Sequence, residues 1–553
     1  MSKERNRRNK NTNQFIVQGS ILAVVGILVR VIGLVKRIPL TNIIGDRGNG
    51  FYAAAYEIYS IVLLISSYSL PTAVSKMVSS RIAVGQYKNA NRILKASLLF
   101  AVVSGAIASI LVYLFADYLA GPIMLEPMSG LALKVLAPTL LVVAIMGVLR
   151  GYFQGIGTMI PTALSQVFEQ IFTVIASLMG ATILFEYGVV VGELLDNEYY
   201  AAAYGAAGGS FGPFVGAIIG LLILSLTYAA YRRPLHKKIL RDRSKTVESY
   251  YTILPLIFAI IVPIILSTAI YNISNILDQR IYNQVMIAKG LEDIKTVHWG
   301  IYTGKYNVLT NIPIAFSSAL CAATVPAITK SVSRGEWSEV GLQIKKVTKL
   351  TVIIAIPCAV AFMILAKDML HLLFNDSTQL ASGLLQVGSI SIIFYSISTL
   401  TNGILQGINK MHIPVINAIS SLIIHLLTLY ALLTMTDLGI YAVVYSKIVF
   451  SLCMCLLNGF SLRRHLRTHI AMKRVVIVST IAALGMGIIL VGLVTLSTII
   501  PREHKLIEVG IMGVICLIGG LTYLILLIQM RGITKRELLA IPGGRFLEPF
   551  LKK

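Results

Sequence analysis

Four basic side chains lie inside or beside apolar segments, where an unpaired charge is costly. Arg30 stands within the first apolar run and Lys36 close to its end. Arg280 and Lys305 flank a later connection between two such runs. An isolated cation in hydrocarbon costs about 2.5–3.5 kcal/mol on insertion scales, so these residues should face polar groups or a ligand. Because such cations suit phosphate and carboxylate oxygens, we predict a binding site for an anionic group.

Polar residues that could complete this site lie on the neighbouring apolar segments. They are Glu57, Asn272, Asn275, Asp278 and Asn311. If the apolar segments cross a membrane, a rise of 1.5 Å per residue places Arg30 about 22 Å from the inner edge of a hydrocarbon core about 30 Å thick. Glu57 then lies about 9 Å from the outer edge, so the two residues are at similar depths. An internal Arg30–Glu57 ion pair is therefore an alternative to ligand binding. Lys36 and Arg280 could likewise reach only the outer headgroups.

The composition indicates that these residues are positioned by membrane-spanning helices. The chain has 553 residues, of which 56% are hydrophobic and 13% charged, and its mean hydropathy is +0.79. These values are typical of an all-α polytopic membrane protein. The net charge of +24 would suggest nucleic acid in a soluble protein, but here the basic residues collect in short loops. That distribution predicts membrane topology and contact with anionic lipid, and no nucleic-acid partner.

Fourteen apolar runs are long enough to cross a hydrocarbon core about 30 Å thick. They are residues 15–37, 51–70, 93–119, 131–152, 161–185, 209–231, 253–278, 301–325, 348–366, 383–405, 414–435, 438–460, 475–499 and 506–530. Lys and Arg concentrate in the N-terminal tail, in every second connection and in the C-terminal tail. The positive-inside rule then predicts that both termini are cytoplasmic.

Two short motifs recur at a common offset. Gly151-Tyr-Phe-Gln154-Gly155 matches Gly403-Ile-Leu-Gln406-Gly407, and the Pro-to-Lys stretch 71–76 resembles 326–330. We interpret this as a duplication that gives two six-helix bundles in parallel repeat, residues 1–248 and 249–465, followed by two extra helices and a cytoplasmic tail in 466–553. Two similar bundles that rock about a midplane site are typical of a transporter.

Enzymatic chemistry has little support in the sequence. There is no P-loop, HExxH, GxSxG or DxD motif, and the loops are too short for a catalytic domain. The five cysteines show no metal-ligand spacing. We therefore predict no catalytic residue, no metal and no cofactor, and leave a coupling cation open.

The stretch Arg30-Val-Ile-Gly33-Leu-Val-Lys36, with Gly45 and the Gly-Tyr-Phe-Gln-Gly loop, resembles the MurJ-type lipid II flippases of the MOP exporter superfamily, close to the polysaccharide transporter branch. The resemblance implies that Arg30, Lys36 and Lys305 line a central cationic cavity for the substrate diphosphate. It also implies that the last two helices form a groove for the undecaprenyl tail. Lys36 stands where the family has arginine, and Arg37 where many members have aspartate.

The implied function is translocation of lipid II from the inner to the outer leaflet of a bacterial plasma membrane by alternating access. Moving each negative charge outward against an inside-negative potential releases about 2.3 kcal/mol per 100 mV, so the potential could drive export. Cell-wall synthases would be possible partners. The alternatives are a flippase for a teichoic-acid, capsule or spore-envelope precursor, a multidrug/cation antiporter on the same fold, and a scaffold that transports nothing.

Overall fold

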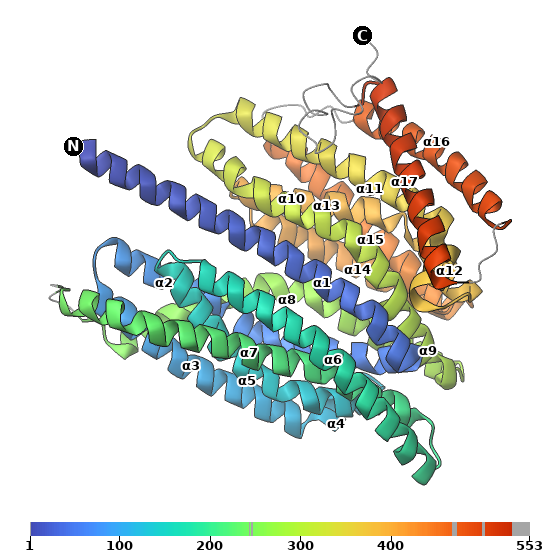
Figure 1. The fold of residues 1–553 in the computed structure, drawn as a ribbon, viewed down its shortest axis with the longest axis horizontal. Helices are drawn as coiled ribbons and strands as arrows, with labels where there is room; N and C mark the ends of the chain where they lie inside the picture. The colour runs from blue at the N-terminus through green and yellow to red at the C-terminus, as the bar shows by residue number, and fades with distance from the viewer. Residues whose placement is uncertain (1, 243, 245–246, 467–472, 500–503, 533–553) are drawn as a thin grey trace. The chain divides into compact units, whose positions relative to one another are not determined.

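The computed structural model describes residues 2–242, 244, 247–466, 473–499 and 504–532, and all regular structure in these ranges is helical (Figure 1). Three five-residue π-helical turns, labelled η, interrupt the α-helices. The elements are α1 (Ser2–Leu63), η1 (Leu64–Tyr68), α2 (Leu70–Ala83), α3 (Tyr87–Leu114), α4 (Ala116–Tyr118), η2 (Leu119–Ile123), α5 (Ser129–Gly155), α6 (Ile160–Leu194), α7 (Tyr199–Leu240), α8 (Tyr250–Ala288), α9 (Glu292–Ile301), η3 (Tyr302–Tyr306), α10 (Asn307–Ser333), α11 (Trp337–Phe374), α12 (Gln379–Gly388), α13 (Ser391–Gly407), α14 (His412–Met435), α15 (Ile440–His465), α16 (Lys473–Ser497) and α17 (Lys505–Gln529).

Ten helical segments in the described ranges are long and apolar enough to cross a membrane, and the chain is a multi-pass membrane protein. The pair α12 and α13, bent by 45°, raises the number to eleven if it counts as one span. The three other predicted spans, 15–37, 51–70 and 253–278, fall on α1, η1, the start of α2, and α8, and they are not among these segments of the described residues. The count of fourteen therefore stays a prediction.

α1 contains the first predicted span and residues 51–63 of the second, which continues through η1. Gly45 separates them with a backbone of φ 69° and ψ −179°, which breaks the helical geometry without a loop. Glycine suits this position because a side chain disfavours positive φ. The predicted first outer connection is thus a kink, and it brings Arg37 onto the same continuous element as Tyr52.

The chain divides into two compact units, Met1–Gly304 and Lys305–Lys553. In the first, α6 packs along α7 and α5 packs against α3 and α7. A Cβ on Gly208 would overlap the Gly180 carbonyl, so these glycines permit the close approach of α7 to α6. α8 and α9 also belong to this unit because they pack on α1, α2 and α3. The predicted boundary between 248 and 249 concerns a six-helix repeat and stays a prediction.

The second unit has its own apolar cores. One joins α11 to the last two helices through residues such as Ile356, Met486 and Leu527. Another joins α10, α11 and α13 through Ile328, Ile344 and similar side chains. Within this unit α16 and α17 lie side by side, as Figure 1 shows in red. The two C-terminal helices are therefore packed on α11.

Candidate functional site

Lys36 is a buried cation on α1. Its side chain is 7% exposed, and its Nζ donates to Ser177 Oγ on α6 at 3.2 Å. Ser177 in turn donates to the Gly209 carbonyl on α7 at 2.8 Å. Among the described residues, no carboxylate lies within ion-pair distance of Lys36. A buried ammonium whose described hydrogen-bond partner is a hydroxyl would gain an ionic partner from an anionic group.

Arg30 lies two turns before Lys36 on α1 and is exposed. It forms no hydrogen bond or ion pair with another described residue, so the alternative Arg30–Glu57 pair is not formed in this structure. Glu57 is half-buried on the second part of α1. Arg30 therefore retains its donors for a ligand or for lipid headgroups.

Arg37 is held by aromatic rings. Its guanidinium carbon lies 5.3 Å from the centre of the Tyr52 ring and 5.9 Å from that of Tyr56, and the two rings are stacked. Such cation–π contacts hold a charge without an acid. The aromatic residues of the second predicted span are the sequence signal for this arrangement, but they do not by themselves specify Arg37 as the cation.

Lys305, in the second unit, is paired with an acid. Its Nζ lies 2.6 Å from Asp376 Oδ2, and both side chains are 6% exposed. Asp376 also accepts from the Thr378 amide at 2.8 Å. It follows Asn375, whose left-handed backbone (φ 52°) ends α11 and turns the chain toward Lys305. The sequence analysis missed Asp376, because an acid in a predicted outer loop agrees equally well with topology alone.

The other predicted site residues are distributed over α8 and α10. Arg280 donates to the backbone carbonyls of Pro122, at 2.7 Å, and Ile123. Asp278 is fully buried and accepts from Ser274 Oγ at 3.3 Å, whereas Asn272 is half-buried and Asn275 and Asn311 are exposed. Lys36, Arg280 and Lys305 thus have three different sets of partners.

Two buried acids outside the spans have opposite pKa shifts. Burial raises the pKa of Glu126 even though Lys295 contacts it. Burial also opposes ionisation of Asp376, but the hydrogen bond from Lys305 and those from Thr378 outweigh it and lower its pKa.

These shifts predict that acid disrupts the two pairs in a fixed order. As pH falls, Glu126 should take up a proton above its ordinary value of 4.5, while Asp376 should stay ionised below 3.8. Glu126 therefore favours folding at low pH and loses that effect as pH rises through its raised pKa; Asp376 favours folding at higher pH and loses it on acidification. Infrared carboxyl bands, assigned with Glu126→Gln and Asp376→Asn, measure the order. Protonation of Asp376 at a higher pH than Glu126 would contradict the prediction.

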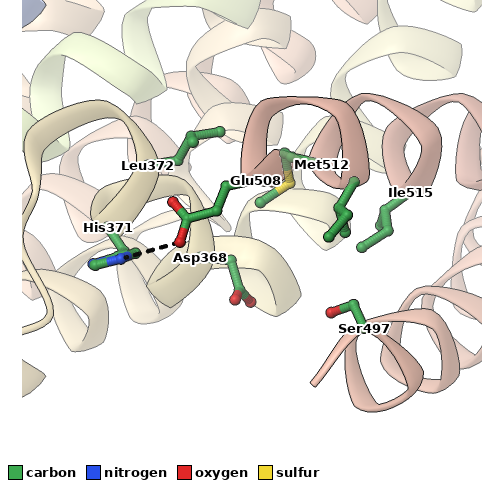
Figure 2. Close-up of a pocket in the computed structure, with 8 residues that line it drawn as sticks. Asp368, His371, Leu372, Ser497, Glu508, Met512 and Ile515 are labelled. Atoms are coloured by element: carbon green, nitrogen blue, oxygen red, sulfur yellow. Dashed lines mark ion pairs between the residues drawn. The ribbon is translucent and has the colours of Figure 1, made fainter. Parts of the chain in front are cut away.

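A small pocket lies between α11 and the last two helices. Figure 2 shows Asp368 and His371 of α11 beside Glu508 of α17 and Ser497 of α16, with His371 Nε2 3.8 Å from Glu508 Oε1. His371 Nδ1 also lies 3.0 Å from Ser377 Oγ. Two carboxylates in one small pocket would repel a diphosphate, so this is not the predicted anion site.

Comparison with known proteins identifies relatives along nearly the whole chain. The family model described as polysaccharide biosynthesis protein matches residues 16–332, and the MatE model matches residues 303–431. The lipid II flippase MurJ of Bacillus subtilis (strain 168) is 28% identical over 92% of this chain and 94% of its own. Stage V sporulation protein B of the same organism is 24% identical over 94% of this chain and 96% of its own.

Solved structures share the fold. An inward-facing multidrug resistance MATE family transporter of the MOP superfamily covers 81% of this chain, and 98% of that chain is matched, with a TM-score of 0.64 and 15% identity. Lipid II flippase MurJ in an inward closed conformation covers 91% of this chain, and 97% of that chain is matched, with a TM-score of 0.62 and 13% identity. At these identities the likeness concerns the fold alone, and both proteins are transporters by name.

Proposed function

This chain belongs to the polysaccharide biosynthesis protein family, and from that premise we propose that it is a flippase that moves lipid II from the inner to the outer leaflet of a bacterial plasma membrane. The observation that carries the proposal is Lys36, a buried cation with no described carboxylate within ion-pair distance. A diphosphate supplies the missing negative charge, and its oxygens accept hydrogen bonds from an ammonium. The full-length similarity to a lipid II flippase supports the choice of substrate.

In this proposal four cations bind the diphosphate at different stages of alternating access: Arg30, Lys36, Arg280 and Lys305. Lys36 is available in the present state, whereas Lys305 must first leave Asp376 and Arg280 must leave its carbonyl partners. The membrane potential drives the charged headgroup outward. The proposed cytoplasmic termini place the basic loops at the inner leaflet, where the substrate is made.

A second substrate is favoured by one specific observation. The chain is nearly as similar to a sporulation protein as to the lipid II flippase. A spore-envelope or other lipid-linked saccharide would share the diphosphate and therefore the same cations. A multidrug antiporter for cationic drugs is disfavoured, because the buried Lys36 would repel its substrate.

The decisive experiment is depletion of the protein followed by identification of the lipid-linked precursor that accumulates facing the cytoplasm. We expect lipid II to accumulate, and wild-type protein to reverse this. Arg30→Ala, which removes donors that no described residue uses, should reach the membrane but fail to reverse the accumulation. Accumulation of another precursor would favour the second substrate, and full reversal by Arg30→Ala would exclude Arg30 from the site.

A further inference from the structure

The end of η2 presents consecutive backbone acceptors to α8. Arg280 donates to the carbonyls of Pro122 and Ile123, and Asn283 Nδ2 donates to the Met124 carbonyl at 2.8 Å. The last carbonyls of a helical segment have no partner within it and form its negative end. An arginine and an amide from α8 satisfy three of these groups in succession.

The next two residues present their acceptors to α9. Lys295 Nζ donates to the Leu125 carbonyl at 2.8 Å and to Glu126 Oε1 at 2.7 Å. Thr296 Oγ1 lies 2.9 Å from each oxygen of Glu126. Glu126 is 2% exposed, and the Lys295 side chain is 9% exposed. The ion pair is therefore shielded from solvent, and removing one partner would leave the other charged group buried without it.

The local backbone explains this concentration of acceptors. Leu125 has a left-handed backbone, with φ 58°, although it is not glycine. Its amide donates to the Gly121 carbonyl at 2.7 Å, and the Glu126 amide donates to the Ala120 carbonyl at 2.9 Å. This turn ends the helix and directs the Leu125 carbonyl and the Glu126 side chain toward the same lysine. A non-glycine residue in this conformation needs compensating contacts, which α9 provides.

α9 is also seated closely against α1, beside the kink at Gly45. A Cβ on Gly300 would overlap the Asp46 carbonyl, and a Cβ on Gly50 would overlap the Thr296 carbonyl. α9 therefore touches backbone on α1 while its side chains bind residues 125 and 126. All of these contacts lie within the first unit.

We propose that an outer latch holds α8 and α9 against the first six predicted helices. The latch consists of the acceptors of Pro122–Glu126 and the donors of Arg280, Asn283, Lys295 and Thr296. The inference rests on the proposed function, because the sequence assigns α8 and α9 to the second repeat, which must move for the outer side to open. Opening requires these hydrogen bonds to break together. The strength of the latch then sets how often the outer side opens.

Hydrogen exchange of the full-length protein in lipid nanodiscs, without added lipid substrate, tests the latch. Lys295→Met should accelerate amide exchange in 119–128 and 292–301 by about tenfold or more, because a hydrogen bond to a charged group is among the stronger ones. Glu126→Gln should act on the same segments, and the double variant should add little to either. Exchange in α14 should not change.

Lys134→Met is the matched control. It breaks a more exposed outer pair, in which Lys134 Nζ lies 2.8 Å from Asp117 Oδ2 with side chains 34% and 73% exposed. Its exchange should resemble wild type. Thr296→Val removes one hydroxyl and should give a smaller local acceleration. Rates that stay unchanged, or rise uniformly along the chain, in both Lys295→Met and Thr296→Val would overturn the latch. Since no substrate is present, this result is independent of the depletion experiment.

Discussion

Replacing Lys36 with methionine is expected to weaken lipid II binding by about 30-fold or more and to leave the protein at least as stable as wild type. Removal of one partner of a buried charge pair typically costs about 2–5 kcal/mol of binding free energy. The folded protein without ligand should not suffer, since Lys36 is buried with Ser177 as its described hydrogen-bond partner. Exchanging such an ammonium for an apolar side chain of similar length removes a desolvation cost.

Binding of purified lipid II in detergent and the thermal midpoint of the same sample measure the two effects together. Lys36→Arg keeps the charge and should retain most of the affinity. Arg37→Gln is the matched neighbour, because its cation rests on Tyr52 and Tyr56 and should contribute less. Unchanged binding by Lys36→Met would remove this residue from the substrate site, and a large drop in the midpoint would show that its role is structural.

Much of the architecture could be predicted from hydropathy, because each apolar run must form a helix to satisfy its backbone in lipid. The long helices α3, α5, α6, α7, α11 and α14–α17 confirm predicted spans. The kink at Gly45 could not be predicted in detail. A glycine between two apolar runs is compatible with a loop, and only the packing around Leu40 and Ile44 fixes a continuous kinked helix.

The candidate site could be predicted in its cations but not in their partners. Arg30, Lys36 and Lys305 are conspicuous because charge in an apolar run is rare. Their partners come from elements distant in sequence, as Ser177 and Asp376 do. Depth along the membrane limits which residues can meet, but rotation of each helix about its axis depends on packing. For this reason similar depth suggested an Arg30–Glu57 ion pair, and that pair is not present in the structure.

Glu126 and Lys295 show a related limit. Both lie in predicted outer connections, where charged residues are expected on topological grounds alone. Their burial depends on the left-handed turn at Leu125 and on the close seating of α9 against α1. Neither the turn nor the close packing can be recognised from the residue types in these two predicted connections. A buried ion pair between two predicted connections therefore emerges only from tertiary structure.

Removing Asp376 while Lys305 remains is expected to destabilise the second unit strongly. Asp376→Ala would leave a buried ammonium without its carboxylate, at a cost of about 3–5 kcal/mol. Lys305→Met should cost a similar amount because it strands the acid. The double variant should be much closer to wild type than the sum of the two, since a buried pair and its apolar replacement are often nearly equal in stability.

Denaturation of all four proteins in detergent completes this double-mutant cycle, and lipid II binding by the same samples separates stability from function. If Asp376 holds Lys305 until a diphosphate replaces it, Asp376→Asn should strengthen binding, because the substrate no longer competes with a carboxylate. Lys305→Met should weaken binding in either background. Additive stability losses would mean that the pair is not coupled. Weaker binding by a folded Asp376→Asn protein would mean that Asp376 positions Lys305 for the substrate instead of competing with it.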